Sequence, residues 1–204
     1  MQGAVKFPTL KFEQAYWKGG LERIAGIDEA GRGAWAGPVA AAAVILPHAA
    51  GLARTLDGVR DSKQMTPPAR QAWAPRIQAI ALGWGVGFAS AAEIDALGIL
   101  PATRLAAVRA LEALAPDCLL TDYLVFREIS LPQTALVKGD CLSLSVAAAS
   151  VLAKTARDAR LRELDGQYPG YGFARHKGYG TRIHQAAIAR MGLCELHRKS
   201  FKIR

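Results

Sequence analysis

The sequence lacks several features that mark large protein classes. Its three cysteines, Cys118, Cys141 and Cys194, form no C-x-x-C pair, so we expect reduced thiols in a cytoplasmic protein rather than a disulfide framework. The longest apolar run, residues 39–46, is too short to cross a membrane, and the first fourteen residues do not have the order of a signal peptide. A G-x-S-x-G motif and a Walker A loop are both missing, which argues against the corresponding serine hydrolases and P-loop enzymes.

What the sequence does have is a globular composition with an uneven charge. Apolar residues make up 51% and charged residues 21% of the 204 residues, enough for one domain with a substantial core. Residues 1–153 carry 14 Lys/Arg and 13 Asp/Glu, a net of +1, whereas residues 154–204 carry 12 and 4, a net of +8. Such a basic segment suits nucleic-acid phosphates, although charge alone is equally compatible with a solvated basic surface.

The order of apolar and polar residues predicts an α/β protein with a mixed sheet. We expect strands at residues 24–28, 39–46, 82–89, 118–122 and 134–137, and helices at residues 66–81, 90–98, 101–115, 143–164 and 181–191. Alternating glycines in the third strand leave one face bare, so another backbone should pack there. The helix from Pro101 should bury Leu105, Val108 and Leu111. We divide the chain into an N-terminal extension (1–22), a core (23–165) and a basic helical C-terminal extension (166–204) of the same domain.

Four carboxylates follow apolar runs: Asp28, Glu29, Asp122 and Asp140. Singly, an Asp at a strand end is usually a turn former. As a set at strand ends they predict a site for Mg²⁺ or Mn²⁺, the hard cations that prefer oxygen ligands. Two such ions can activate water and stabilise the leaving oxygen in phosphodiester hydrolysis. Because neighbours in a regular strand face opposite ways, Asp28 and Glu29 can share one metal pair only if the strand bends.

The turn Gly31-Arg32-Gly33 follows these acids directly. Its glycines allow backbone N–H groups to approach a sugar or phosphate, and a plain hairpin turn is the simpler alternative. The spacing Gly31-x-Gly33-x-x-Ala36 nominally matches a dinucleotide fingerprint, but a strand rather than a helix is expected next, which argues against it.

The basic quarter contains Tyr179 between two glycines. An exposed tyrosine there can stack on a ribose or donate to a hydroxyl, or it can pack the loop onto the core. Lys63, in Asp61-Ser62-Lys63, is suited to a phosphate contact, although a solvated loop is as plausible. His176, His184 and His197 lack metal-ligand spacing, which favours satisfied or surface histidines.

Taken together, the motifs resemble those of bacterial ribonuclease HII over residues 22–201. They are Gly26-Ile-Asp28-Glu29-Ala-Gly31-Arg32-Gly33, Asp61-Ser-Lys63, Thr121-Asp122, Lys138-Gly-Asp140, Ala147-Ala-Ala-Ser150-Val-Leu-Ala-Lys154-Thr-Ala-Arg157-Asp158, His176-Lys-Gly-Tyr179-Gly and His197-Arg-Lys-Ser200-Phe201. The resemblance implies a ribonuclease H-like fold: a mixed five-stranded sheet flanked by helices, with a helical C-terminal extension.

The resemblance also implies an activity and residue roles. The expected enzyme is an endoribonuclease that cuts the RNA strand of RNA–DNA hybrids and nicks DNA duplexes 5′ to an embedded ribonucleotide, leaving 3′-hydroxyl and 5′-phosphate ends. The four acids match the metal-binding catalytic residues, and Gly31, Arg32, Gly33 and Tyr179 match the elements that read the 2′-hydroxyl. Lys63 matches a phosphate contact. Two residues depart from the family pattern, Ala34 where proline is usual and Tyr123 where glycine is commoner.

Two rival functions stay open at this stage: a non-catalytic module that binds hybrids through its basic quarter, and a DNA-processing nuclease or resolvase on the same fold. The absence of heptads leaves a monomer as the expectation.

Overall fold

The computed structural model describes residues 7–203. Its centre is a sheet ordered β3-β2-β1-β4-β5, made of β1 (Ile24–Ala30), β2 (Val39–Ile45), β3 (Gly83–Ala89), β4 (Cys118–Asp122) and β5 (Gln133–Leu136). The pairs β1–β2 and β2–β3 are antiparallel, whereas β1–β4 and β4–β5 are parallel. The predicted mixed five-stranded sheet is therefore confirmed, with β1 continuing two residues past Asp28.

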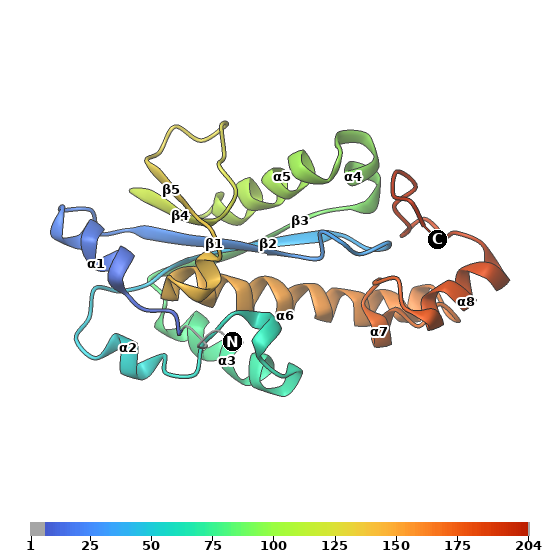
Figure 1. Ribbon diagram of the computed structural model, residues 1–204, viewed down its shortest axis with the longest axis horizontal. Coiled ribbons are helices and arrows are strands. Elements are labelled where there is room, and N and C mark those ends of the chain that lie inside the picture. The colour runs from blue at the N-terminus through green and yellow to red at the C-terminus, as the bar shows by residue number, and fades with distance from the viewer. Residues whose placement is uncertain (1–6, 204) are drawn as a thin grey trace, which may run out of the picture.

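Helices cover both faces of the sheet (Figure 1). On one face lie α4 (Ala91–Leu97) and α5 (Ile99–Leu111), and on the other lie α3 (Pro67–Ile80) and α6 (Leu144–Gln167). The remaining elements are short: α1 (Lys11–Lys18), α2 (Leu52–Thr55), α7 (Phe173–His176), α8 (Arg182–Met191) and the 3₁₀ turns η1 (Ser62–Gln64) and η2 (Gly139–Cys141). The short helix α7 packs against α6, and α8 packs against α7, so this part of the chain forms one end of the molecule (Figure 1).

Small residues allow the helices to approach the sheet closely. A Cβ at Gly85 or Gly87 of β3 would lie 2.1 Å from the carbonyl oxygen of Ala110 or Ala106 in α5. A Cβ at Gly26 of β1 would lie 2.2 Å from the backbone of Ser145 in α6. The predicted backbone contact against the glycine face of β3 is confirmed, and the helix that makes it is α5.

The buried face of α5 corrects one prediction. The helix begins at Ile99 rather than Pro101, and Leu105 and Val108 are only half-buried. Its buried residues are mostly small: Ala102, Thr103, Ala106, Ala107, Ala110 and Leu111. Because the glycines of β3 bring the two backbones together, larger side chains do not fit between them.

Side-chain caps begin the helices where the sequence predicts them. Thr66, Ser143 and Thr181 each accept a hydrogen bond from a backbone N–H three residues on, and Ser90 forms a capping box with Glu93. The helix α6 continues to Gln167, three residues beyond its predicted end. None of the helices in the described part of the chain is long and apolar enough to cross a membrane.

The predicted N-terminal extension falls partly outside the described residues, which begin at residue 7. Its described part contains α1, whose Trp17 is buried against the core and stacks on His48. The α1 carboxylate of Glu13 is also buried, and it accepts hydrogen bonds from the Ser143 and Ser145 hydroxyls at the start of α6. This contact ties α1 to the helix that faces the site.

Candidate active site

Asp28 and Glu29 lie near the end of β1 on opposite faces of the sheet. Gly26 faces α6, so Asp28, two residues on, faces α6 as well, whereas Ile27 packs in the cluster around α5 and Glu29 shares its side. The register with β2 stays regular as far as Ala30 opposite Ala40. The pairing therefore contains no β-bulge at the two acids.

Asp122 and Asp140 belong to the neighbouring strands. Asp122 is the last residue of β4, and its Oδ1 accepts a hydrogen bond of 2.7 Å from the Gly139 N–H. Asp140 follows β5 in η2 and is buried. The hydrogen bond to Gly139 holds η2 against the end of β4, so these two acids lie together at the carboxyl ends of parallel strands.

The acids act on one another electrostatically. Burial raises the pKa of Asp28 well above its ordinary value, and the carboxylates of Glu29 and Asp122 raise it further. Burial likewise raises the pKa of Glu29, with Arg32 opposing the change and Asp122 adding to it. Burial, Asp61 and Asp122 raise the pKa of Asp140 to about 6. Asp122 thus acts on all three other acids, and so much negative charge in one region favours bound cations.

Two cationic side chains offset part of this charge. The Arg32 Nη1 lies 3.0 Å from Glu29 Oε1, and the Lys63 Nζ lies 3.9 Å from Asp140 Oδ2. Burial lowers the pKa of Lys63, but the surrounding carboxylates outweigh this effect and the pKa lies above its ordinary value. Lys63 therefore stays charged beside the acids.

The donor set fits a hard divalent cation. The potential ligand atoms are mainly carboxylate oxygens. Within the described chain, no histidine is among the groups whose charges shift the pKa of Asp28, Glu29 or Asp140. The tightest potential ligand group in residues 7–203 is Asp61, Asp140 and Cys141, whose ligand atoms lie within 4.8 Å of one another. Asp61 was not among the predicted ligands, although this residue belongs to the same Asp61-Ser62-Lys63 motif as Lys63. Asp28, Glu29 and Asp122 lie outside this tight group.

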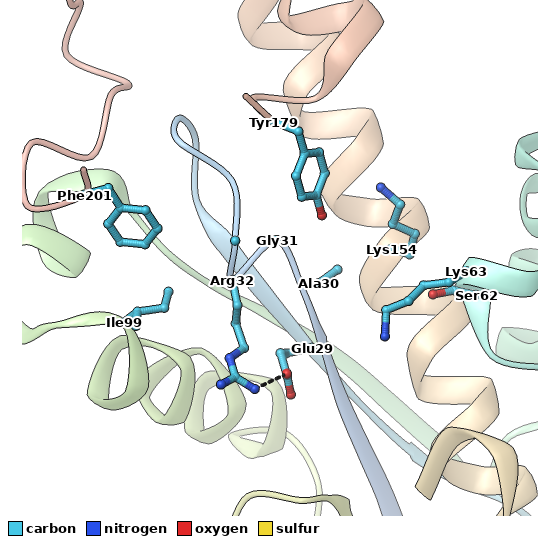
Figure 2. A pocket seen from close by; sticks show the side chains of 11 residues that line it. Glu29, Ala30, Gly31, Arg32, Ser62, Lys63, Ile99, Lys154, Tyr179 and Phe201 are labelled. Atoms are coloured by element: carbon cyan, nitrogen blue, oxygen red, sulfur yellow. Dashed lines mark hydrogen bonds and ion pairs between the residues drawn. The ribbon is translucent and has the colours of Figure 1, made fainter. Parts of the chain in front are cut away.

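One cavity of about 570 Å³ contains all five residues predicted to contact substrate (Figure 2). Its walls are Glu29, Ala30, Gly31, Arg32, Gly33, Ser62, Lys63, Ile99, Lys154, Tyr179 and Phe201. In Figure 2 the tyrosine ring of Tyr179 stands across the cavity from Ile99 and Phe201, with Gly31 between them. Ile99, Lys154 and Phe201 were not singled out as site residues from the sequence, although Lys154 and Phe201 stand inside its family motifs. Ile99 has no such signal, because an apolar residue at the start of a helix usually belongs to the core.

Two buried arginines fix the turn and the tyrosine loop in place. Arg157 of α6 donates to the carbonyls of Pro38, Ala36 and Lys177, and Arg198 donates to those of Gly37 and Arg32. The carbonyl of Gly178 accepts from the N–H groups of Trp35 and Ala36. Burial lowers the pKa of Arg198 to about 9, which leaves it charged at neutral pH. The two loops that line the cavity are therefore linked through buried charged hydrogen bonds.

Comparison with known proteins identifies the family. The family model described as Ribonuclease HII matches residues 25–204. The ribonuclease HII of Synechococcus sp. (strain JA-3-3Ab) is 53% identical over 195 residues, covering 95% of this chain and 88% of that protein. This chain belongs to the ribonuclease HII family. It is an endoribonuclease that acts on RNA–DNA hybrids.

Solved structures support the fold. The PCNA:RNase HII complex from Archaeoglobus fulgidus matches with a TM-score of 0.75 at 27% identity, over 89% of this chain and 96% of that one. Bst-RNase HIII in complex with Mn²⁺ matches with a TM-score of 0.69 at 21% identity, over 89% and 67% respectively. The second likeness concerns the fold alone.

Three buried histidines support the tyrosine loop of this ribonuclease HII. His184 Nδ1 lies 3.0 Å from the Tyr179 carbonyl oxygen, and its Nε2 lies 3.1 Å from His197 Nε2. The ring of His176 stacks on that of His184 at 4.3 Å, and its Nδ1 accepts from the Gly178 N–H. Burial lowers the pKa of His184 to about 4. The sequence analysis expected satisfied or surface histidines, and all three are buried and hydrogen-bonded.

The two departures from the ribonuclease HII pattern differ in their surroundings. Ala34 is fully buried, and its N–H donates to the Gly31 carbonyl at 3.3 Å, which closes the turn. Tyr123 is 68% exposed and has a φ of 65°. It does not pack inward against the core.

Proposed function

We propose that this enzyme, besides cutting RNA in hybrids, nicks DNA duplexes on the 5′ side of an embedded ribonucleotide and leaves 3′-hydroxyl and 5′-phosphate ends. The proposal rests on one observation: Glu29, an acid of the cluster, lines the same cavity as the Gly31-Arg32-Gly33 turn and Tyr179. A site that reads one ribose needs the recognition elements beside the acids that cut the neighbouring phosphate. The family membership supports the same reading.

In this proposal Asp28, Glu29, Asp122 and Asp140 hold Mg²⁺ or Mn²⁺. When bound, the metal supplies an activated water for in-line attack and a counter-charge for the leaving O3′ of the upstream nucleotide. Burial and mutual repulsion raise the pKa of three of the acids, and a bound cation would relieve that repulsion. Lys63, 3.9 Å from Asp140, is placed to approach the scissile phosphate.

The Gly31-Arg32-Gly33 turn and Tyr179 read the 2′-hydroxyl in this proposal. Gly33 has open space where a Cβ would stand, so its backbone is accessible to a sugar. Lys154 Nζ and Arg157 Cζ each lie 5.4 Å from the centre of the Tyr179 ring, which orients the ring and makes its surroundings attractive to phosphate. The 2′-hydroxyl is the group that distinguishes RNA from DNA locally. The basic C-terminal extension, residues 166–204, then contacts the duplex beyond the ribonucleotide.

The test is cleavage of a DNA duplex that contains one ribonucleotide. Purified protein is incubated with this duplex in Mg²⁺, in Mn²⁺ and in EDTA, and the product ends are mapped. We expect cutting 5′ to the ribonucleotide in either metal and none in EDTA. Cutting of hybrids without any nick at the single ribonucleotide would contradict the proposal.

The family membership excludes the first rival, a non-catalytic module, because it makes the chain an endoribonuclease. The same experiment tests the second rival. Cleavage of an all-DNA junction would support a resolvase. A matched all-DNA duplex and junction serve as the controls.

A further inference from the structure

A second cavity is lined by two of the acids, Asp122 and Asp140. It measures about 370 Å³, and its walls are Asp61, Lys63, Gln64, Asp122, Tyr123, Lys138, Asp140 and Cys141. Tyr179 and the Gly31-Arg32-Gly33 turn do not line it, and of the residues that the structure describes only Lys63 lines both cavities. A substrate that spans the acids can therefore contact two separate sets of residues, one in each cavity.

Two residues of this cavity have a backbone conformation that side chains disfavour. Tyr123 has a φ of 65° and Lys138 a φ of 59°, both in the left-handed region. Non-glycine residues with bulky side chains rarely adopt it, and such strain collects at functional sites. Each residue lies within two positions of a candidate ligand, since Tyr123 follows Asp122 and Lys138 stands two before Asp140.

The strained side chains contribute nothing to the core. Tyr123 is 68% exposed and Lys138 is exposed, as is the neighbouring Val137 at 70%. The Tyr123 N–H donates to the Leu136 carbonyl at 2.9 Å, which sets Tyr123 beside Val137 at the end of the sheet. An aromatic and an aliphatic side chain are thus exposed next to a lysine, without internal packing to explain them.

We propose that Tyr123 and Lys138 form a substrate subsite that holds the nucleotide flanking the scissile phosphate in the cavity that Tyr179 does not line. Tyr123 provides an apolar surface for the sugar or base, and Lys138 contacts the phosphate. Asp61, Asp122 and Asp140 give this cavity negative charge. Metal ions held by the acids would offset that charge, because bound cations dominate the local field. The inference deepens the proposed function and rests on it.

The variant Tyr123→Gly tests the subsite with opposite effects on binding and stability. Removing a side chain from a left-handed position leaves the Tm unchanged or raises it by about 2–4 °C. Affinity for a short RNA–DNA hybrid, measured by fluorescence anisotropy in Ca²⁺ under conditions in which the hybrid stays uncut, is expected to weaken about five- to tenfold. Tyr123→Phe retains the ring and is expected to bind as the wild type does.

Lys138→Gln provides an independent arm. This variant is expected to weaken hybrid binding about threefold. It should also reduce the slope of log Kd against log salt concentration by about one, the change that corresponds to one phosphate contact. The matched controls are Lys18→Gln, an exposed residue at the end of α1, and Leu82→Ala, an exposed residue beside the other end of the sheet. Both controls should bind as the wild type does.

Unchanged affinity in Tyr123→Gly and Lys138→Gln would overturn the subsite, as would a Tm loss in Tyr123→Gly, because the tyrosine would then be structural. Failure of the proposed function looks different: the wild type would bind the hybrid yet leave the single-ribonucleotide duplex uncut.

Discussion

The two glycines of the Gly31-Arg32-Gly33 turn are predicted to respond in opposite ways to the same substitution. Gly31 has a φ of +94°, and a Cβ there would lie 1.9 Å from Arg157 Nε and 2.4 Å from Arg157 Cδ. A Cβ at Gly33 would meet nothing within 4 Å, and its φ lies outside the left-handed region. Gly31 is therefore required by the fold, whereas only an incoming ligand would exclude a side chain at Gly33.

The magnitudes follow from these surroundings. Gly31→Ala combines a left-handed alanine, about 1–2 kcal/mol, with overpacking against Arg157, about 1–3 kcal/mol. A loss of this size lowers the Tm by roughly 5–20 °C. Gly33→Ala should instead stabilise the protein by about 0.4–1 kcal/mol, because it restricts the unfolded chain. If the Gly33 backbone contacts the ribose, the added methyl group costs about 1–3 kcal/mol of transition-state binding, or about 5–150-fold in kcat/KM.

The assay measures Tm and kcat/KM on the single-ribonucleotide duplex for both variants. Gly166→Ala is the matched control, because Gly166 also has open space and lies in α6 far along the chain from the turn. We expect Gly166→Ala to retain full activity. Should Gly33→Ala be stabilised and fully active, the backbone at this turn does not approach the ribose, and the proposed reading of the 2′-hydroxyl is wrong.

Three further predictions address the acids and the histidines. Asp28→Ala should reduce single-turnover cleavage by about 10³-fold or more while hybrid binding persists, and a fully active variant would refute the assignment of Asp28 to the metal site. Asp28, Glu29 and Asp140 have raised pKa values, about 6 for Asp140, so protons compete with the metal for these carboxylates. Calorimetry should therefore find weaker Mn²⁺ binding at pH 5.5 than at pH 8. Equal affinities at the two pH values would contradict this prediction. The pKa of His184 is lowered to about 4 in the folded protein. As the pH falls below about 6.5, the imidazole is protonated in the unfolded chain before it is protonated in the folded one. The folding stability therefore decreases by at most about 3 kcal/mol between pH 6.5 and pH 4. Urea unfolding should show this loss in the wild type minus His184→Gln difference, and a flat difference would refute it.

The fold could be predicted largely from local patterns in the sequence. Strand and helix order follows from apolar runs, proline and capping residues, as at Ser90 with Glu93. The buried face of α5 could not be predicted in the same way, because it depends on how close β3 comes. Alternating glycines indicate a close approach, yet only the three-dimensional contact shows that alanines rather than Leu105 and Val108 meet them.

Candidate site residues could be predicted only where they belong to short sequence motifs. The acids, the glycine turn and Tyr179 carry such motifs, whereas Ile99 joins the cavity through the packing of α5. The buried pairing of Arg157 and Arg198 with carbonyls gives no periodic signal either, since a basic residue in a basic segment is normally taken as exposed. Their positions depend on contacts between residues more than 100 apart in the chain.

The geometry of β1 explains how two adjacent acids in a regular strand can serve one site. Pairing of β1 with β4 ends at Ile27 opposite Thr121, whereas pairing with β2 continues to Ala30. From Asp28 onward β1 therefore has a partner on one side only, and the open side is the one from which Asp122 acts on both acids. A cation or phosphate that enters where β1 and β4 part can reach side chains on either face around the end of the sheet. In the proposed function, the divergence of these two parallel strands takes the place of a bend in β1, and it lies at the carboxyl ends of strands, where α/β sheets commonly form their sites.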